Sequence, residues 1–96
     1  MGAGDARDAP WHPDPDVVVE KMEGSSVLIN LSTNRMFELN ETGTRFWELL
    51  MEGDDLSRIK ERLVREYEVD RSTVDREVED LMSRLAAERL ILQDQP

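Results

Sequence analysis

Residues 26–50 read SVLINLSTNRMFELNETGTRFWELL, and this stretch decides the fold. The apolar segment at residues 27–29 has the composition of a strand. A polar break at residues 32–34 separates it from a second strand-like segment, residues 35–39, and asparagine in that break suits a tight turn. The second segment then continues through Asn40 into an amphipathic helix without a linker. One end of that strand is therefore held by the helix, and its outer edge is expected to lack a partner within the chain.

Another strand precedes these two. Residues 17–22 begin with three β-branched valines and lead into a Glu-Gly-Ser turn signal at residues 23–25, which predicts a hairpin with the next segment. The three segments form an antiparallel meander in which the third strand, residues 35–39, is an edge. The period of two along that strand separates two pairs of side chains, with Phe37 and Leu39 on the core face, and Met36 and Glu38 on the other face.

Three helices are predicted after the sheet, because apolar residues recur there at helical spacing. The first begins after Asn40, which is a suitable cap, and Gly53 stops it. The second begins at Asp54 or Asp55 and carries basic residues on its outer sides. The apolar stripes consist of Phe46, Trp47, Leu49 and Leu50 in the first helix, and of Leu56, Ile59, Leu63 and Tyr67 in the second.

The third helix is predicted to begin near Asp70 or Ser72, where Ser72 and Asp75 resemble a capping box. Its core stripe, at spacings of four, three and four, consists of Val74, Val78, Leu81 and Leu85. Met82 lies one position beyond this stripe, where it is either a flexible gap filler or part of a surface that accepts varied apolar groups. The apolar run at residues 90–92 is either the end of the fold or a short closing strand.

This order of elements predicts an α+β fold, a winged-helix-like domain with an N-terminal three-stranded antiparallel sheet followed by three helices. Winged-helix domains commonly bind DNA through the third helix. Here that helix has more acidic than basic residues, and the chain has a formal net charge of −10, so phosphate contact is disfavoured. A DNA-binding transcription factor is therefore kept only as an alternative function. Salt-dependent DNA binding would test it. A helix-mediated oligomerisation module, tested by mass in solution, is another alternative.

Composition narrows the function further. With 96 residues, 39% of them hydrophobic, the chain builds one small core. It has no cysteine, and the sole histidine, His12, lies in a proline-rich segment, so we expect no enzyme mechanism, no metal site and no cofactor. No apolar run approaches the roughly 20 residues that span a bilayer, and the start of the chain has no hydrophobic signal region. We expect a cytoplasmic protein with no membrane or nucleic-acid partner.

Three regions are predicted along the chain. Residues 1–16 contain three prolines and two glycines without apolar periodicity, which predicts a mobile N-terminal arm that is dispensable for folding. Trp11, within this arm, either docks on a surface or caps an edge of the core. Residues 17–92 form the domain, and residues 93–96 are a C-terminal tail.

Several short motifs occur together and in order, and they are individually weak but jointly specific. They are FELN at residues 37–40 with TG at residues 42–43 and Trp47, YEVD at residues 67–70, and residues 78–85 followed by LI at residues 90–91. In this combination residues 17–92 closely resemble the PqqD-like superfamily, whose small domains recognise ribosomally made peptides awaiting modification. Glu88-Arg89 departs from the pattern, because many members have a glycine there.

The resemblance implies a binding domain and not an enzyme. In such domains the leader segment of a precursor peptide adds as a strand beside the third strand and packs against the third helix. The stand-alone length and the acidic arm look most like the recognition protein of a lasso-peptide pathway, which passes its precursor to a separate leader peptidase or other modifying enzyme. The alternative within the family is a protein of the quinone-cofactor pathway, which presents its peptide to a radical enzyme.

The predicted peptide-binding site has two parts. An unpaired strand edge offers backbone groups to a peptide, and pockets beside it accept alternate side chains. The strand residues are Arg35, Met36, Phe37, Glu38 and Leu39, and the helix residues are Val74, Asp75, Val78, Glu79 and Met82. Core packing also explains the two valines, and solvated acids on an exposed helix face also explain Asp75 and Glu79.

Overall fold

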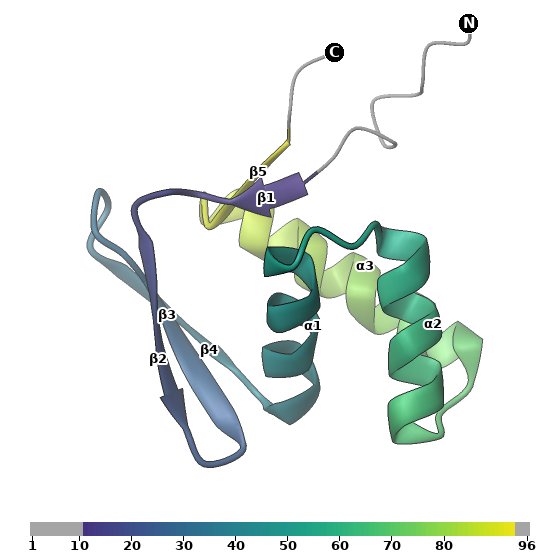
Figure 1. The fold of residues 1–96 in the computed structure, drawn as a ribbon. Helices are drawn as coiled ribbons and strands as arrows, with labels where there is room; N and C mark the ends of the chain where they lie inside the picture. The colour runs from purple at the N-terminus through teal and green to yellow at the C-terminus, as the bar shows by residue number, and fades with distance from the viewer. Residues whose placement is uncertain (1–10, 94–96) are drawn as a thin grey trace, which may run out of the picture.

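The computed structural model describes residues 11–93, which form three helices and two small sheets (Figure 1). In chain order the elements are β1 (Trp11–Pro13), β2 (Val17–Met22), β3 (Ser25–Asn30), β4 (Arg35–Leu39), α1 (Glu41–Met51), α2 (Leu56–Tyr67), α3 (Arg71–Ala87) and β5 (Ile91–Gln93). The predicted α+β fold is confirmed, since a three-stranded antiparallel sheet precedes the three helices. All three helices lie on one side of that sheet (Figure 1).

The three-stranded sheet has the predicted meander topology, with β3 between β2 and β4. Two left-handed residues form its turns, Gly24 with φ 76° and Asn34 with φ 63°, and only glycine and asparagine adopt this conformation readily. Leu28 lies opposite Phe37 in the register, on the face that meets the helices. Within residues 11–93, β4 pairs with β3 alone, so its other edge is free.

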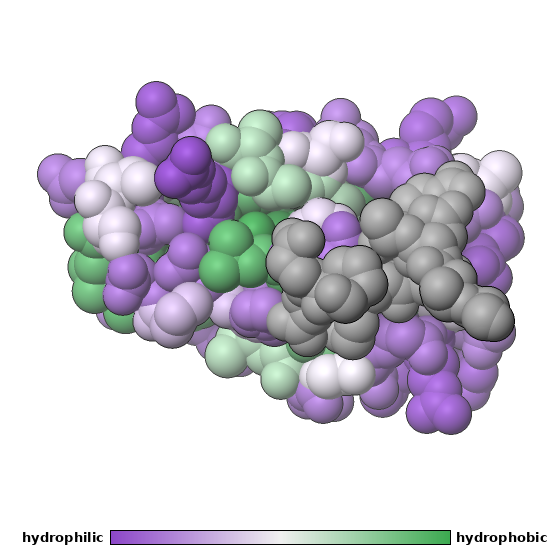
Figure 2. Space-filling model, turned by 90° about the horizontal axis from the view of Figure 1, so that it is seen from above, coloured by the Kyte–Doolittle hydropathy of each residue, from purple (hydrophilic) through white to green (hydrophobic). Residues whose placement is uncertain are grey.

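The outer face of this sheet carries a row of apolar side chains. Val18 pairs with Ile29, and Ile29 pairs with Met36, so the three lie side by side across the strands. The exposed fractions are 43% for Val18 and 68% for Met36. Met36 therefore points away from the core, as the alternation predicts. Seen from above, hydrophobic residues gather in the middle and at the left end of an otherwise largely hydrophilic surface (Figure 2).

Two of the three helix starts have a side-chain cap, and the cap at Asn40 is the one that the sequence predicts. Asn40 precedes α1, and its side-chain oxygen accepts a hydrogen bond from the backbone N–H of Gly43 at 2.8 Å. Asp55 precedes α2 and accepts from the N–H of Arg58 at 2.9 Å. Each bond satisfies a backbone donor that the helix itself leaves unpaired, and so fixes where the helix begins.

The predicted capping box at the start of α3 is wrong. The helix begins at Arg71 with Asp70 as its N-cap residue, so Ser72 already lies within the first turn. Asp75 accepts a hydrogen bond from the Arg71 side chain at 3.1 Å and forms an ion pair with Lys60 of α2 at 3.2 Å. Asp75 thus joins α3 to α2 instead of capping its own helix.

One hydrophobic core joins the sheet, the three helices and the chain end. Its buried members are Leu28, Leu39, Phe46, Trp47, Leu49, Leu50, Ile59, Leu63, Val74, Val78, Met82, Leu85, Leu90 and Ile91. The predicted stripes of α1 and α2 are confirmed, with Leu56 and Tyr67 partly buried at the margin of the core.

The predicted stripe of α3 is wrong by one position. Met82 is a core residue with an exposed fraction of 9%, whereas Leu81 is only partly buried. At 3.6 residues per turn, these two side chains flank the line through Val74, Val78 and Leu85 on opposite sides. Sequence spacing alone therefore allows either residue to face inward, and the position of α2 draws Met82 into the core.

The expectation of an arm without regular structure up to residue 16 is wrong for its last part. Trp11–Pro13 forms β1, which pairs antiparallel with β5, and Trp11 packs against the core. The N–H of Asp14 also donates to the carbonyl of Leu90 at 3.0 Å. The partner strand comes from the apolar run at residues 90–92. Because this run is distant in sequence, the composition of the proline-rich segment did not predict the pairing. Residues 1–10 and 94–96 lie outside the described residues.

Candidate functional site

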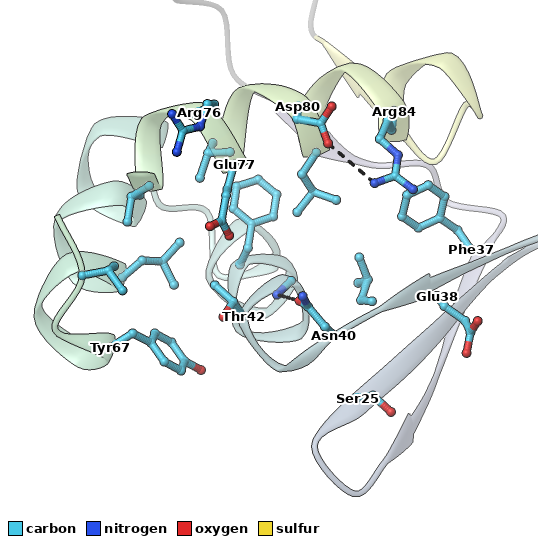
Figure 3. A pocket seen from close by; sticks show the side chains of 18 residues that line it. Ser25, Phe37, Glu38, Asn40, Thr42, Tyr67, Arg76, Glu77, Asp80 and Arg84 are labelled. Carbon is cyan, nitrogen blue, oxygen red and sulfur yellow. Dashed lines mark hydrogen bonds and ion pairs between the residues drawn. The ribbon is translucent and has the colours of Figure 1, made fainter. Parts of the chain in front are cut away.

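A groove with a cavity volume of about 770 Å³ lies between β4 and α3, and the start of α1 forms its floor (Figure 3). Its apolar lining residues are Phe37, Leu39, Phe46, Leu63, Val69, Val74, Val78 and Leu81. Several are core residues whose outer surface the groove reaches, so the cavity is an open margin of the hydrophobic core. A concave apolar site with a few polar groups is typical of ligand binding.

The floor of the groove depends on a close approach at Gly43, which is buried at the start of α1. A Cβ atom at this position would lie 3.2 Å from the side-chain oxygen of Asn40 and 3.2 Å from Cδ2 of Leu39. These distances are shorter than ordinary van der Waals contact, so a larger residue here would require the side chains of Asn40 and Leu39 to shift by a few tenths of an ångström. Glycine at this position therefore keeps the Asn40 cap and Leu39 close to the start of α1.

Two contacts tie β4 to α3 at one end of the groove. Arg35 forms an ion pair with Glu88 at 2.8 Å, and the Arg84 guanidinium lies 5.1 Å from the centre of the Phe37 ring. Arg84 is also 3.6 Å from Asp80, one turn back on α3. Both arginine side chains are more than half exposed, so solvent screening leaves each contact a small contribution to stability.

The buried side chain of Asn30 forms hydrogen bonds at the same end of the groove. Its side-chain N–H donates to the carbonyl of Arg89 at 2.9 Å, just after α3. Its side-chain oxygen accepts from the N–H of Ser32 at 2.9 Å, in the turn before β4. Because a buried amide is costly to leave unpaired, these bonds hold the β3–β4 turn against the end of α3.

The opposite end of the groove is more polar. Thr42 at the start of α1, Tyr67 at the end of α2 and Glu77 of α3 surround it (Figure 3). Burial raises the pKa of Tyr67, and the nearby carboxylates of Glu41 and Glu66 raise it further. The tyrosine hydroxyl therefore stays protonated at neutral pH and can donate a hydrogen bond.

An ion-pair network joins α1 to α2 and to the sheet. Arg45 donates two hydrogen bonds to Glu66, at 2.8 and 3.1 Å, and one to Glu48 at 3.1 Å. Lys21 of β2 also contacts Glu48, at 2.6 Å. Arg45 lowers the pKa of Glu66, and Lys21 followed by Arg45 lowers the pKa of Glu48. These ion pairs link α1, which forms the groove floor, to α2 and to β2.

The structure brings together five of the ten predicted site residues. Those that line the groove are Phe37, Glu38, Leu39, Val74 and Val78. Arg35 and Met36 belong to β4, but Met36 points to the outer face of the sheet and Arg35 pairs with Glu88. On α3, Met82 is in the core, and Asp75 faces α2. Glu79 is exposed and is not among the groove residues.

The α3 side chains at the groove that sequence reasoning missed are Arg76, Glu77, Asp80, Leu81 and Arg84. Glu77, Leu81 and Arg84 are spaced by four and three residues, which places them on one face of a helix. That spacing was a usable signal. The sequence alone does not show which face of α3 packs against the core, because the helix has another face with apolar and polar residues at the same spacing.

Comparison with protein families identifies the family of this chain. The model of coenzyme PQQ synthesis protein D (PqqD) matches residues 25–91, from the central strand to the start of β5. This is well over half of the chain. The chain belongs to the PqqD family. Comparison with curated protein sequences gave no significant match.

Two solved structures resemble this PqqD-family chain over 88% of its length and 99% of theirs. TbiB1, solved in complex with the TbiA(beta) leader peptide, is 33% identical with a TM-score of 0.81. Lasso peptide synthetase B1, complexed with a leader peptide, is 24% identical with a TM-score of 0.79. The second likeness shows the shared fold.

Within residues 11–93, no three histidine, cysteine, aspartate or glutamate side chains are grouped closely enough to hold a metal ion. None of the helices in the same range is both long and apolar enough to cross a membrane.

Proposed function

We propose that this protein binds the leader segment of a ribosomally made precursor peptide, which adds as a strand to the free edge of β4 and rests in the groove against α3. The observation that carries the proposal is the position of that edge. It is the only unpaired side of β4 within residues 11–93, and it borders an apolar groove.

Backbone geometry supports strand addition. Five residues of β4 extend over about 17 Å, and an edge strand directs alternate N–H and C=O groups outward. These groups bind a peptide backbone irrespective of its sequence. The contacts of Arg35 with Glu88 and of Arg84 with Phe37 keep β4 at a set distance from α3, so less ordering is needed when a peptide binds.

Side-chain selection comes from the groove. Alternate side chains of an added strand point toward α3, where Leu81, Val78 and Phe46 offer apolar surface. Burying one large apolar side chain there contributes about 1.5–3 kcal/mol. The remaining side chains point to the outer face beside Met36 and Glu38, which are exposed, and contribute less to selection.

Similarity to known proteins supports the same function. TbiB1, a third identical over nearly its whole length, was solved with a leader peptide. Both structural relatives carry leader peptides, and one is a lasso peptide synthetase component. We therefore favour a role in lasso-peptide biosynthesis, with delivery of the bound precursor to a leader peptidase. The name of the family model favours the second candidate, a peptide chaperone for a radical enzyme in quinone-cofactor biosynthesis.

Hydrogen exchange tests the binding mode directly. The probe is the leader segment of a precursor peptide identified among the genes next to this protein's gene, added in excess at neutral pH. Edge pairing should slow exchange of the outward β4 amides by at least about tenfold, while the already paired amides of β2 and β3 change little. A leader that binds with unchanged β4 exchange would exclude strand addition. A leader that does not bind at all would refute the proposed function.

DNA binding is tested in parallel, because the fold resembles a winged helix. The groove face of α3 has no net positive charge, because Glu77 and Asp80 balance Arg76 and Arg84, and the net charge of the chain is −10. Both features oppose contact with phosphates. Labelled duplex DNA at low salt should show no saturable binding, and tight binding to DNA without binding to the leader would reverse the assignment.

A further inference from the structure

Glu77 is a charged group of the groove without a partner. Its carboxylate points from α3 into the groove, toward the start of α1 where Thr42 lies (Figure 3). Among residues 11–93, no hydrogen bond or ion pair involves its side chain. The other charged groove residue that points inward, Arg84, is already paired with Asp80 and stacked on Phe37.

A strand bound in the groove would cover this carboxylate. Removing water from a carboxylate without supplying a partner is unfavourable. A cation at hydrogen-bond distance compensates for the lost hydration. Arg76 precedes Glu77 in the sequence, but adjacent residues on a helix do not face each other, and the two side chains form no ion pair. Glu77 is exposed to solvent in the free domain, so a basic side chain of the bound peptide is the partner that would compensate for the water lost on binding.

The spacing along α3 sets where in the peptide that cation lies. Leu81, a partly buried apolar residue on the groove face of α3, follows Glu77 by four positions, or about 6 Å along the helix axis. Residues two apart on one face of a strand are about 6.6–6.8 Å apart. For a peptide strand that runs alongside α3, a side chain over Leu81 and another beside Glu77 are therefore two residues apart.

The direction of the peptide decides which residue comes first. All pairs in the three-stranded sheet are antiparallel. β4 runs from the Phe37 end of the groove toward the Asn40 end, where α1 starts and Glu77 points (Figure 3). A strand that continues the antiparallel pattern enters at the Glu77 end and leaves at the Phe37 end.

We infer that the groove selects peptides with a basic side chain two positions before a large apolar side chain, and that Glu77 is the residue that reads the basic one. This inference rests on the proposed function and names the class of peptide that the site accepts. Glu77 acts as a specificity-determining residue, because backbone pairing alone does not distinguish one sequence from another.

Synthetic nonapeptides test the inference by fluorescence anisotropy. Each has Leu at position 5 and a constant serine, threonine and valine background, with Lys, Gln or Glu at position 3. A second set carries the same three residues at position 7. The Lys peptide of the first set should bind about tenfold more tightly than its Glu counterpart, with the difference shrinking at high salt. The second set should show little preference.

Two variants of Glu77 and one control variant of Glu79 locate the effect. Glu77→Lys should invert the preference at position 3, and Glu77→Gln should remove it. Glu79→Lys makes the same charge change on α3 outside the groove, and should leave the preference unchanged. Thermal melting of each variant checks that these exposed substitutions leave the fold intact.

The outcomes separate this inference from the proposed function. If the precursor leader itself does not bind, the proposed function fails. If the leader binds but the nonapeptides show no Lys preference at position 3, or none of them binds, the inference is overturned. A preference that persists in Glu77→Gln would also overturn it.

Discussion

Two edges of the hydrophobic core differ in whether the chain itself covers them. At one edge, β1 and β5 pair with each other, and Trp11 packs against the core. At the other, between β4 and α3, the chain leaves the strand edge unpaired and the apolar surface of Leu81 and Phe37 partly accessible. A domain of this size has little apolar surface to spare. Under the proposed function, the open edge beside the free strand serves binding, and the closed edge serves stability.

The sharpest separation of core from groove comes from neighbouring residues of α3. Met82 is in the core, so Met82→Glu places an unpaired carboxylate among apolar side chains. We expect a loss of about 3–5 kcal/mol in the free energy of unfolding, and hence an unfolded or barely folded protein. Urea denaturation followed by circular dichroism measures this. A variant with wild-type stability would show that Met82 does not belong to the core.

Leu81→Glu is the matched change on the groove side. Leu81 is only partly buried, so we expect the domain to fold with a stability loss below that of Met82→Glu. Leader affinity should fall by about 100-fold, because a carboxylate replaces the apolar contact of the guest side chain. Isothermal titration calorimetry on the folded variant decides, and unchanged affinity would remove the groove from the binding site.

The closed edge should matter for stability and not for binding. Trp11→Ala removes a partly buried indole from the core margin, and we expect a loss of about 1–3 kcal/mol. For a domain of this size each kcal/mol lowers Tm by about 4–8 °C. Leader affinity at 10 °C should stay within about twofold of wild type. An unchanged Tm would mean that the β1–β5 sheet does not seal the core.

The smallest expected effect concerns surface ion pairs that lie away from both edges. The pKa values of Glu48 and Glu66 are lowered in the folded protein by Lys21 and Arg45. These pairs therefore add stability that is fully present above about pH 4.5, the ordinary value for glutamate, and is lost as the pH falls through the lower folded-state pKa. Both carboxylates are about one-third exposed, so the contribution is at most about 1 kcal/mol.

Arg45→Gln tests the origin of that acid sensitivity. Wild type and variant should differ in stability at pH 7 and converge as the pH approaches 3, measured by urea denaturation across the range. If the two proteins keep a constant difference in stability down to pH 3, the network contributes through packing and not through charge.

The sequence alone determined the sheet, the three helices and the edge position of β4. Gly24 and Asn34 form the tight turns, and Asn40 and Asp55 cap two helices. Short stretches of sequence are enough to predict such turns and helix starts. The motifs also indicated the PqqD family, which comparison shows. Only the tertiary structure decided which side of α3 faces the groove, because Leu81 and Met82 fit a helical stripe equally well until α2 is in place. It also decided the fate of Trp11, since a three-residue strand forms only where a distant partner, β5, supplies its hydrogen bonds.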